Sequence, residues 1–282
     1  MKNNLVTMSL NRIISSNCIL GEGLLVKNSQ AAWVDIENNN LFIEENMSLN
    51  SYLIANKPSV VFSVVEDKVI LGTDIGLVSF NLEDKKEKIL SYAPHKNKIK
   101  EYRSNDGGFF KDCKLLSYMH RSDPKNNSGM IYLILKEKES YLLLDDSLHI
   151  PNSFIEIGPN EILISDSLKG QIWLYKIDDD GSLLDKILWA QLESGIAPDG
   201  GCIINNLIFF TLWDGSSIAV FNKDGTLLTN LSLPVIRPTN CKFDKVSSQL
   251  WITSASEGLS KDDIKLYPSS GNTFIYDLKI KN

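Results

Sequence analysis

Short apolar stretches rich in Val, Ile, Leu, Phe and Tyr recur along the whole chain, and polar turns of Gly, Asn, Asp or Ser separate them. Two clear examples are "KVILGTDIGLVSFNLED" from Lys68 and "EILISDSLKGQIWLYKIDDDG" from Glu161. No long segment of the sequence shows the 3.6-residue spacing of apolar positions that indicates an amphipathic helix. The pattern therefore predicts an all-β protein of short strands joined by tight turns.

The stretches form six similar units, each with an apolar strand, a polar turn and a second strand that ends in charged residues. The units recur roughly every 40 to 50 residues, which is the period of β-propeller blades. We therefore expect one domain over residues 1–282, a six-bladed β-propeller with four-stranded antiparallel blades around a central channel. A β-sandwich whose hairpins resemble one another by chance is the alternative. The inner strands of the blades are expected near residues 31–36, 68–73, 113–119, 161–166, 206–213 and 249–255.

Composition narrows the possible partners and the compartment. Hydrophobic residues make up 43% of the 282 residues, which is enough for a core. There are 35 acids against 29 bases, so we expect no nucleic-acid partner and no membrane partner, since either would need a basic patch. The sequence starts without a signal-peptide pattern, and no stretch is long enough to span a membrane. The four scattered cysteines are typical of buried thiols in a reducing compartment: Cys18, Cys113, Cys202 and Cys241.

These features predict a cytoplasmic protein. A closed propeller leaves no long strand edge exposed, so we expect a monomer or a weak dimer.

Polar residues interrupt the apolar pattern at a similar position in several units. They are Glu22 in "GEG", the segment "RSNDGG" at 103–108, Asn152, Asp199 and Asn240. Because each precedes an expected inner strand by a similar distance, all of them should lie at the same end of the channel. The oxygens of Glu22, Asn152 and Asp199 would form a hard ligand set that suits Ca²⁺, Mg²⁺ or Mn²⁺ and tolerates Zn²⁺. Taken singly, an Asn or Asp before Gly is an ordinary turn residue.

Six segments, taken in their order along the chain, resemble the gluconolactonase and regucalcin (senescence marker protein) family of six-bladed β-propeller lactonases. They are "LGEG…WVDI", "RSNDGG", "PNSF…ILISDSLKGQIWLYKID", "APDGGCI…LWDGSSIAVFNKDG", "LPVIRPTNCKFD" and "LWITSASEGLS". The resemblance extends from Leu20 to about Leu278 and covers nearly the whole chain.

This resemblance implies one divalent cation on the channel axis, held by Glu22, Asn152 and Asp199. Ca²⁺ is favoured, and Zn²⁺, Mg²⁺ or Mn²⁺ are alternatives. The resemblance also implies that Arg103 and Asn105 face the substrate and that Asp199 is the catalytic base. A carboxylate that binds a cation is a weak base, however, because the positive charge lowers its pKa.

The chain departs from the family pattern beside these residues. Ser153 stands where the family usually has glycine, and Ser122 stands where sugar-binding members tend to have an acid. His120 and Arg121 precede Ser122, so these three residues are candidates for substrate contacts that suit a more anionic or differently shaped lactone. The alternatives are that His120 and Arg121 point to solvent and that Arg103 forms a surface ion pair.

The sequence therefore predicts a divalent-metal-dependent hydrolase of carbohydrate metabolism that opens a sugar lactone (aldonolactone) or a similar cyclic ester. The cation would polarise the carbonyl and help to activate water. Two other classes remain open: a propeller that binds a metal or a sugar acid without turnover, and a hydrolase of another ester, such as an aryl ester or a phosphotriester. Trp213 is a candidate for the channel mouth.

Overall fold

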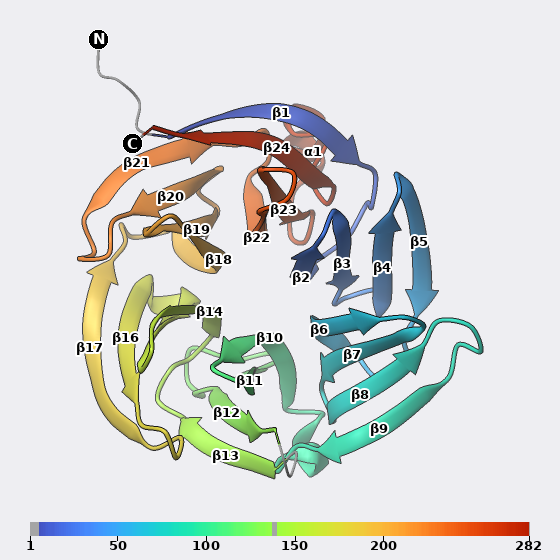
Figure 1. Ribbon diagram of the computed structural model, residues 1–282, viewed down its shortest axis with the longest axis vertical. Coiled ribbons are helices and arrows are strands. Elements are labelled where there is room, and N and C mark those ends of the chain that lie inside the picture. Colours follow the sequence, from blue (N-terminus) through green and yellow to red (C-terminus); the bar gives the residue numbers. More distant parts are fainter. Residues whose placement is uncertain (1–5, 137–139, 282) are drawn as a thin grey trace.

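The computed structural model describes residues 6–136 and 140–281, which form a ring of six four-stranded antiparallel sheets around a central channel (Figure 1). Each sheet is one blade, with its first strand at the channel and its fourth strand at the rim of the ring (Figure 1). The prediction of an all-β, six-bladed propeller is confirmed.

The strands fall into four sets by their position in the blade. The first strands are β2 (Gly21–Lys27), β6 (Pro58–Val65), β10 (Tyr102–Phe110), β14 (Pro151–Gly158), β18 (Ala197–Ile204) and β22 (Arg237–Asp244). The second strands are β3 (Gln30–Asp35), β7 (Lys68–Thr73), β11 (Cys113–His120), β15 (Glu161–Asp166), β19 (Leu207–Trp213) and β23 (Gln249–Ala255). The third strands are β4 (Asn40–Glu45), β8 (Gly76–Asn81), β12 (Met130–Leu135), β16 (Gln171–Ile177), β20 (Ser217–Phe221) and β24 (Thr273–Ile280). The outer strands are β5 (Ser48–Leu53), β9 (Glu87–Tyr92), β13 (Ser140–Asp145), β17 (Leu183–Gln191), β21 (Leu227–Ser232) and β1 (Val6–Ile14).

The strands that were expected to line the channel are the second strands of their blades, and that part of the prediction is wrong. The ranges 31–36 and 68–73, for example, correspond to β3 and β7, whereas β2 and β6 lie at the channel (Figure 1). The second strands are the most apolar because both of their faces pack against neighbouring blades. The first strands crowd around a narrow axis, where small and polar residues replace bulky ones.

Apolar side chains fill the spaces between neighbouring blades. Leu41 of blade 1 and Val69 and Phe80 of blade 2 belong to one such cluster, and a similar cluster joins every other pair of adjacent blades. Each fully buried side chain of this size stabilises the fold by roughly 1.5–3 kcal/mol relative to exposure to water. This packing makes the ring a rigid frame for side chains at the channel.

The first and last strands of the described chain close the ring. β1 pairs antiparallel with β24, from Val6 opposite Ile280 to Ile14 opposite Thr273, so both ends of the chain contribute to blade 6. In the part of the chain that the structure describes, the helical segments are the short turns η1 (Lys96–Lys98) and η2 (Ser167–Lys169) and one α-helix, α1 (Lys261–Leu266). Within the described residues, no helix reaches the length and hydropathy that a membrane span requires.

Candidate functional site

A cavity of about 1110 Å³ opens at the end of the channel where the first strands begin and the second strands end. Four polar side chains from different blades line it: Glu22 of β2, Asn105 of β10, Asn152 of β14 and Asp199 of β18. Each of these residues is at most 7% exposed. The structure thus brings together the three predicted metal ligands and one predicted substrate contact. They lie on the first strands themselves, whereas the sequence placed them in the loops before an inner strand.

A break in the strand pairing places each of these side chains. The register between first and second strand shifts between Glu22 and Leu25, Ser104 and Gly107, Asn152 and Phe154, and Pro198 and Gly201. Such β-bulges bend a strand and redirect its side chains. Four first strands therefore each have a β-bulge at the same level of the channel.

The glycine after Glu22 is required by this geometry. Gly23 has a φ of +60°, and a Cβ atom on it would lie 2.3 Å from the carbonyl oxygen of Ser59 in the neighbouring blade. Its backbone N–H donates to Glu22 Oε2 at 3.1 Å. The "GEG" sequence thus permits a tight bulge that carries the carboxylate into the cavity.

Hydrogen bonds link the polar groups in pairs, two of them between blades and one within β10. Asn152 Nδ2 donates to Asp199 Oδ1, and Asn240 Nδ2 donates to Glu22 Oε2 at 3.4 Å. Arg103 Nη1 donates to Asn105 Oδ1 at 2.9 Å. Amides thus surround both carboxylates, while among the described residues neither carboxylate forms an ion pair.

Burial and mutual repulsion raise the pKa values of the carboxyl groups. Burial and the neighbouring Asp106 raise the pKa of Glu22 to about 8. Burial, Glu22 and Asp106 together raise the pKa of Asp199 well above its usual range. The Arg103 guanidinium lowers both pKa values, but by less than burial raises them. Without a cation, the raised pKa values favour protonated, uncharged carboxyl groups, and a bound cation would favour their charged forms instead.

The donor atoms fit a hard divalent cation. Asp106 Oδ1 and Asn240 Oδ1 are buried without a hydrogen-bond partner among the described residues, which is unusual for oxygen atoms. No three His, Cys, Asp or Glu side chains of the described residues gather closely enough to hold a metal. The predicted set does not need three such groups, because its third ligand, Asn152, is an amide. That Glu22, Asn152 and Asp199 hold a cation stays a prediction.

Asp106 belongs to this cluster although the sequence analysis did not select it. It is 2% exposed, and its Oδ2 accepts the backbone N–H of Ser153 at 3.0 Å. It follows Asn105 in "RSNDGG", where an Asp before Gly looks like a turn residue. No local sequence pattern marks it, because only the structure shows that it lies inside a bulged strand rather than in a turn.

The third blade does not present all of its predicted contacts to the cavity. Arg103 and Arg121 line the cavity, whereas His120 and Ser122 are not among the described residues that line it. His120 Nδ1 accepts the backbone N–H of Asp123 at 3.0 Å, and its ring packs against Tyr102.

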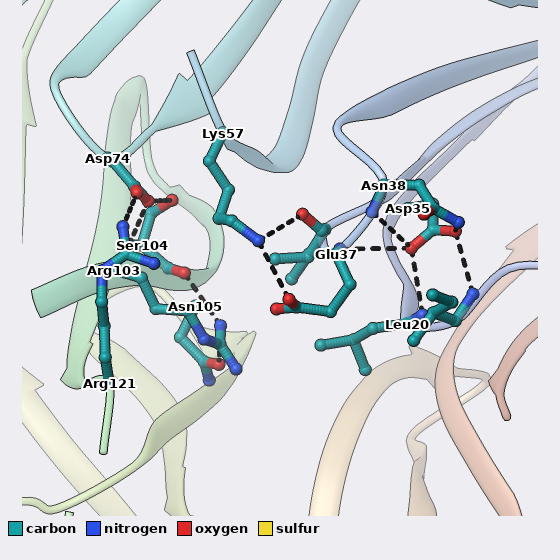
Figure 2. Close-up of polar contacts among 12 residues, drawn as sticks. Leu20, Asp35, Glu37, Asn38, Lys57, Asp74, Arg103, Ser104, Asn105 and Arg121 are labelled. Atoms are coloured by element: carbon teal, nitrogen blue, oxygen red, sulfur yellow. Dashed lines mark hydrogen bonds and ion pairs between the residues drawn. The ribbon is translucent and has the colours of Figure 1, made fainter. Parts of the chain in front are cut away.

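Arg121 is already occupied by contacts within the protein. It forms an ion pair with Asp74 (Figure 2). Its Nε donates to the carbonyl oxygens of Ile99 at 2.8 Å and Tyr102 at 3.1 Å. Ser104 also donates its backbone N–H to Asp74, at 2.9 Å. Asp74 thus ties the start of β10 to blade 2, and Arg121 neutralises it.

The mouth of the cavity near blade 1 is held by similar contacts. Lys57 Nζ lies 3.1 Å from Glu37 Oε2 and donates to the carbonyl oxygen of Ile36 at 2.9 Å (Figure 2). Asp35 accepts the backbone N–H groups of Ile19 and Leu20 at 2.9 and 3.0 Å, just before β2 begins. These bonds fix the strand that carries Glu22.

The fold and the site define a six-bladed propeller with an acidic, oxygen-rich pocket at one end of its channel. Residues 20–256 match the family described as the SMP-30/Gluconolactonase/LRE-like region, and the chain belongs to this family.

Individual relatives are more distant. Regucalcin of Gallus gallus is 30% identical over 80 residues, which is 27% of this chain and 27% of that protein. A calcium-binding protein, regucalcin, from Agrobacterium tumefaciens has a TM-score of 0.87 at 19% identity, over 97% of this chain and 95% of that chain. A gluconolactonase from Xanthomonas campestris has a TM-score of 0.72 at 16% identity, over 95% of this chain and 89% of that chain. At these identities the solved structures show the shared fold.

Proposed function

We propose that the protein is a divalent-cation-dependent hydrolase that opens a lactone or a similar cyclic ester. The observation that carries the proposal is that two buried carboxylates, Glu22 and Asp199, line the cavity together with Asn152, whose amide donates to Asp199. Membership of the family supports it, as do the names of two structural neighbours, a calcium-binding regucalcin and a gluconolactonase.

The residues of the cavity have distinct roles in this proposal. Glu22, Asn152 and Asp199 would hold the cation, which when bound acts as a Lewis acid on the ester carbonyl. Asp199 would take the proton of the attacking water, although the bound cation lowers the pKa of its carboxylate and makes it a weaker base. Arg103 donates to Asn105 through one nitrogen, and its remaining N–H groups would bind oxygen atoms of the substrate.

Asp199→Asn tests the proposal because it keeps the size of the side chain and removes its charge. We expect the chelator-sensitive release of protons from a panel of lactones to fall by a factor of about 10² to 10⁴. Circular dichroism should show that the variant still folds. Asp224→Asn, a change in the exposed hairpin between β20 and β21, should leave the rate unchanged. A protein that binds Ca²⁺, Mg²⁺, Mn²⁺ or Zn²⁺ but opens no lactone faster than the uncatalysed rate would overturn the proposal.

A further inference from the structure

The wall of the cavity is divided into an apolar arc and a polar arc. The apolar arc runs over blades 3 to 5, where polar residues such as Lys169, Gln191 and Glu193 also line the cavity. Its apolar side chains are those of Met119, Ile150, Leu168, Leu192, Ile196 and Trp213. The polar arc lies opposite, on blades 6, 1 and 3, and includes Glu257, Glu37 and Arg103. A ligand that fills the cavity therefore meets apolar side chains together with polar ones over blades 3 to 5, and charged groups on the other side.

The apolar arc is fixed in place by hydrogen bonds. Gln191 Nε2 donates to the carbonyl oxygens of Lys169 and Gly170 at 3.0 and 3.1 Å, and Leu192 donates its backbone N–H to Gly170 at 2.8 Å. These bonds hold the loop after β17 against η2, which carries Leu168. Leu168 is 36% exposed although it lines the cavity, so a ligand would remove apolar surface from water there.

The arginines that flank this arc are already neutralised. Arg237 Nε lies 2.6 Å from Asp214 Oδ1, and its guanidinium covers the Trp213 ring, 4.7 Å from the ring centroid. Arg121 forms its ion pair with Asp74. Binding an anionic substituent at either arginine would compete with an existing pair, so these contacts do not favour an anionic lactone.

We infer that the substrate is an amphiphilic lactone, with an alkyl or aryl substituent that lies on the apolar arc. This inference rests on the proposed function and names its substrate class. The ester would lie over the floor of the cavity and the substituent against Leu168, Leu192 and Ile196. A fully hydroxylated sugar lactone would instead place hydroxyl groups against the Leu168, Leu192 and Ile196 side chains, which have no hydrogen-bonding atoms of their own.

A series of γ-lactones with hydrogen, ethyl, butyl or hexyl at the γ carbon tests the inference by turnover. We expect kcat/KM to rise about threefold for each methylene that the arc covers, and to exceed the value for galactono-γ-lactone. Leu168→Ser should flatten this dependence on chain length. Leu184→Ser is the matched control, because Leu184 lies on the outer strand β17 of the same blade and is 61% exposed, and it should leave the dependence unchanged.

Binding of non-hydrolysable lactams separates the inference from the proposed function. The probes are pyrrolidin-2-ones with the same alkyl series at carbon 5 and a hydroxylated galactonolactam, measured by calorimetry in the presence of Ca²⁺. Affinity that rises with alkyl length in the wild type, and less steeply in Leu168→Ser, supports the inference even if no lactone is opened. Equal affinities along the series, or tighter binding of the hydroxylated lactam, overturn it even if sugar lactones are hydrolysed.

Discussion

At the scale of single residues, several carboxyl groups lie buried at the channel, where loss of hydration raises the free energy of their charged forms. Glu22, Asp106 and Asp199 are each at most 5% exposed, and burial raises the pKa of all three. A fold selected for stability alone would not place three such groups together, because each charge loses its hydration. Glu22 and Asp199 line the cavity and Asp106 lies near them, and carboxyl groups with raised pKa values in such a place indicate a functional site.

Glu22→Gln should make the chelated protein more stable at alkaline pH. Glu22 has a pKa of about 8 in the folded protein against an ordinary value of 4.5, so the folded state binds more protons between these values. Its contribution to stability is complete below about pH 4.5 and is lost as the pH rises through 8. Thermal unfolding in a chelator from pH 5 to 9 should show a falling Tm for the wild type and a flatter profile for the variant. One pKa unit corresponds to about 1.4 kcal/mol, so the rise from 4.5 to about 8 implies a difference in the free energy of unfolding of up to about 5 kcal/mol at pH 9.

Glu45→Gln, which changes an exposed acid on β4, should behave as the wild type. Identical pH profiles for the wild type and Glu22→Gln would contradict the prediction.

Ser153 occupies a backbone conformation that favours glycine. Its φ is +51°, which explains why the family usually has glycine here, and its Oγ donates to the backbone oxygen of Asp199 and lies 3.1 Å from Ser165 Oγ. Ser153→Ala keeps the strain and loses these bonds, so it should destabilise the protein by about 1–2 kcal/mol. Ser153→Gly loses the same bonds but relieves the strain, and it should be about 1 kcal/mol more stable than Ser153→Ala. Urea unfolding of both variants measures the difference, and equal stabilities would show that the backbone is not strained.

At the scale of strands, the sequence predicted the second strands well and the first strands poorly. The second strands could be predicted from their own residues, because an apolar run such as "VILG" in β7 indicates a strand that is buried on both faces. The first strands read as turns, because "GEG", "NDGG" and "PDGG" carry turn residues inside bulged strands. The predicted ligands could still be found because they occupy a similar position in several repeated units. The positions of Asp106 and of the apolar arc depend on packing between blades, which local sequence patterns do not show.

Two neighbouring first strands carry a pair of thiols. All four cysteines are free, and Cys202 Sγ of β18 lies 3.9 Å from Cys241 Sγ of β22. The hydrogen bond with Cys241 and the charge of Lys242 lower the pKa of Cys202, which favours its reactive thiolate form. We expect diamide, a thiol oxidant, to join the two sulfurs in a disulfide, with loss of one hydrogen from each. The sulfurs must move from 3.9 Å to about 2.05 Å apart, which requires a small shift of the two strands.

Mass spectrometry of the oxidised protein should find this cross-link and a loss of about 2 Da. Cys202→Ser should abolish it, and Cys113→Ser should not. Four thiols that remain free after treatment with diamide would show that the two blades cannot approach closely enough.

At the scale of the whole molecule, the ring is closed by contacts that no local pattern could indicate. β1 joins β24, more than 250 residues away in the sequence, and Arg12 of β1 reaches Glu44 of β4 in blade 1. The repeat predicted six blades, but it gave no element to the first residues of the chain, which have no repeat partner. Ring closure therefore had to come from the structure.

Arg12→Ala should weaken this closure by leaving Glu44 without a counter-charge. The Glu44 side chain is 3% exposed, and Arg12 Nη2 lies 2.5 Å from its Oε1. Because the Arg12 side chain is 26% exposed and partly screened by water, we expect a loss of about 2 kcal/mol in the free energy of unfolding. Adding Glu44→Gln to Arg12→Ala should recover part of this loss, since a neutral amide needs no counter-charge. Lys265→Ala, which removes the exposed pair with Asp262, should cost less than about 0.5 kcal/mol. Urea unfolding of these three variants and of Glu44→Gln alone measures the coupling energy between Arg12 and Glu44. Strictly additive effects of Arg12→Ala and Glu44→Gln would show that the two residues do not act as a pair.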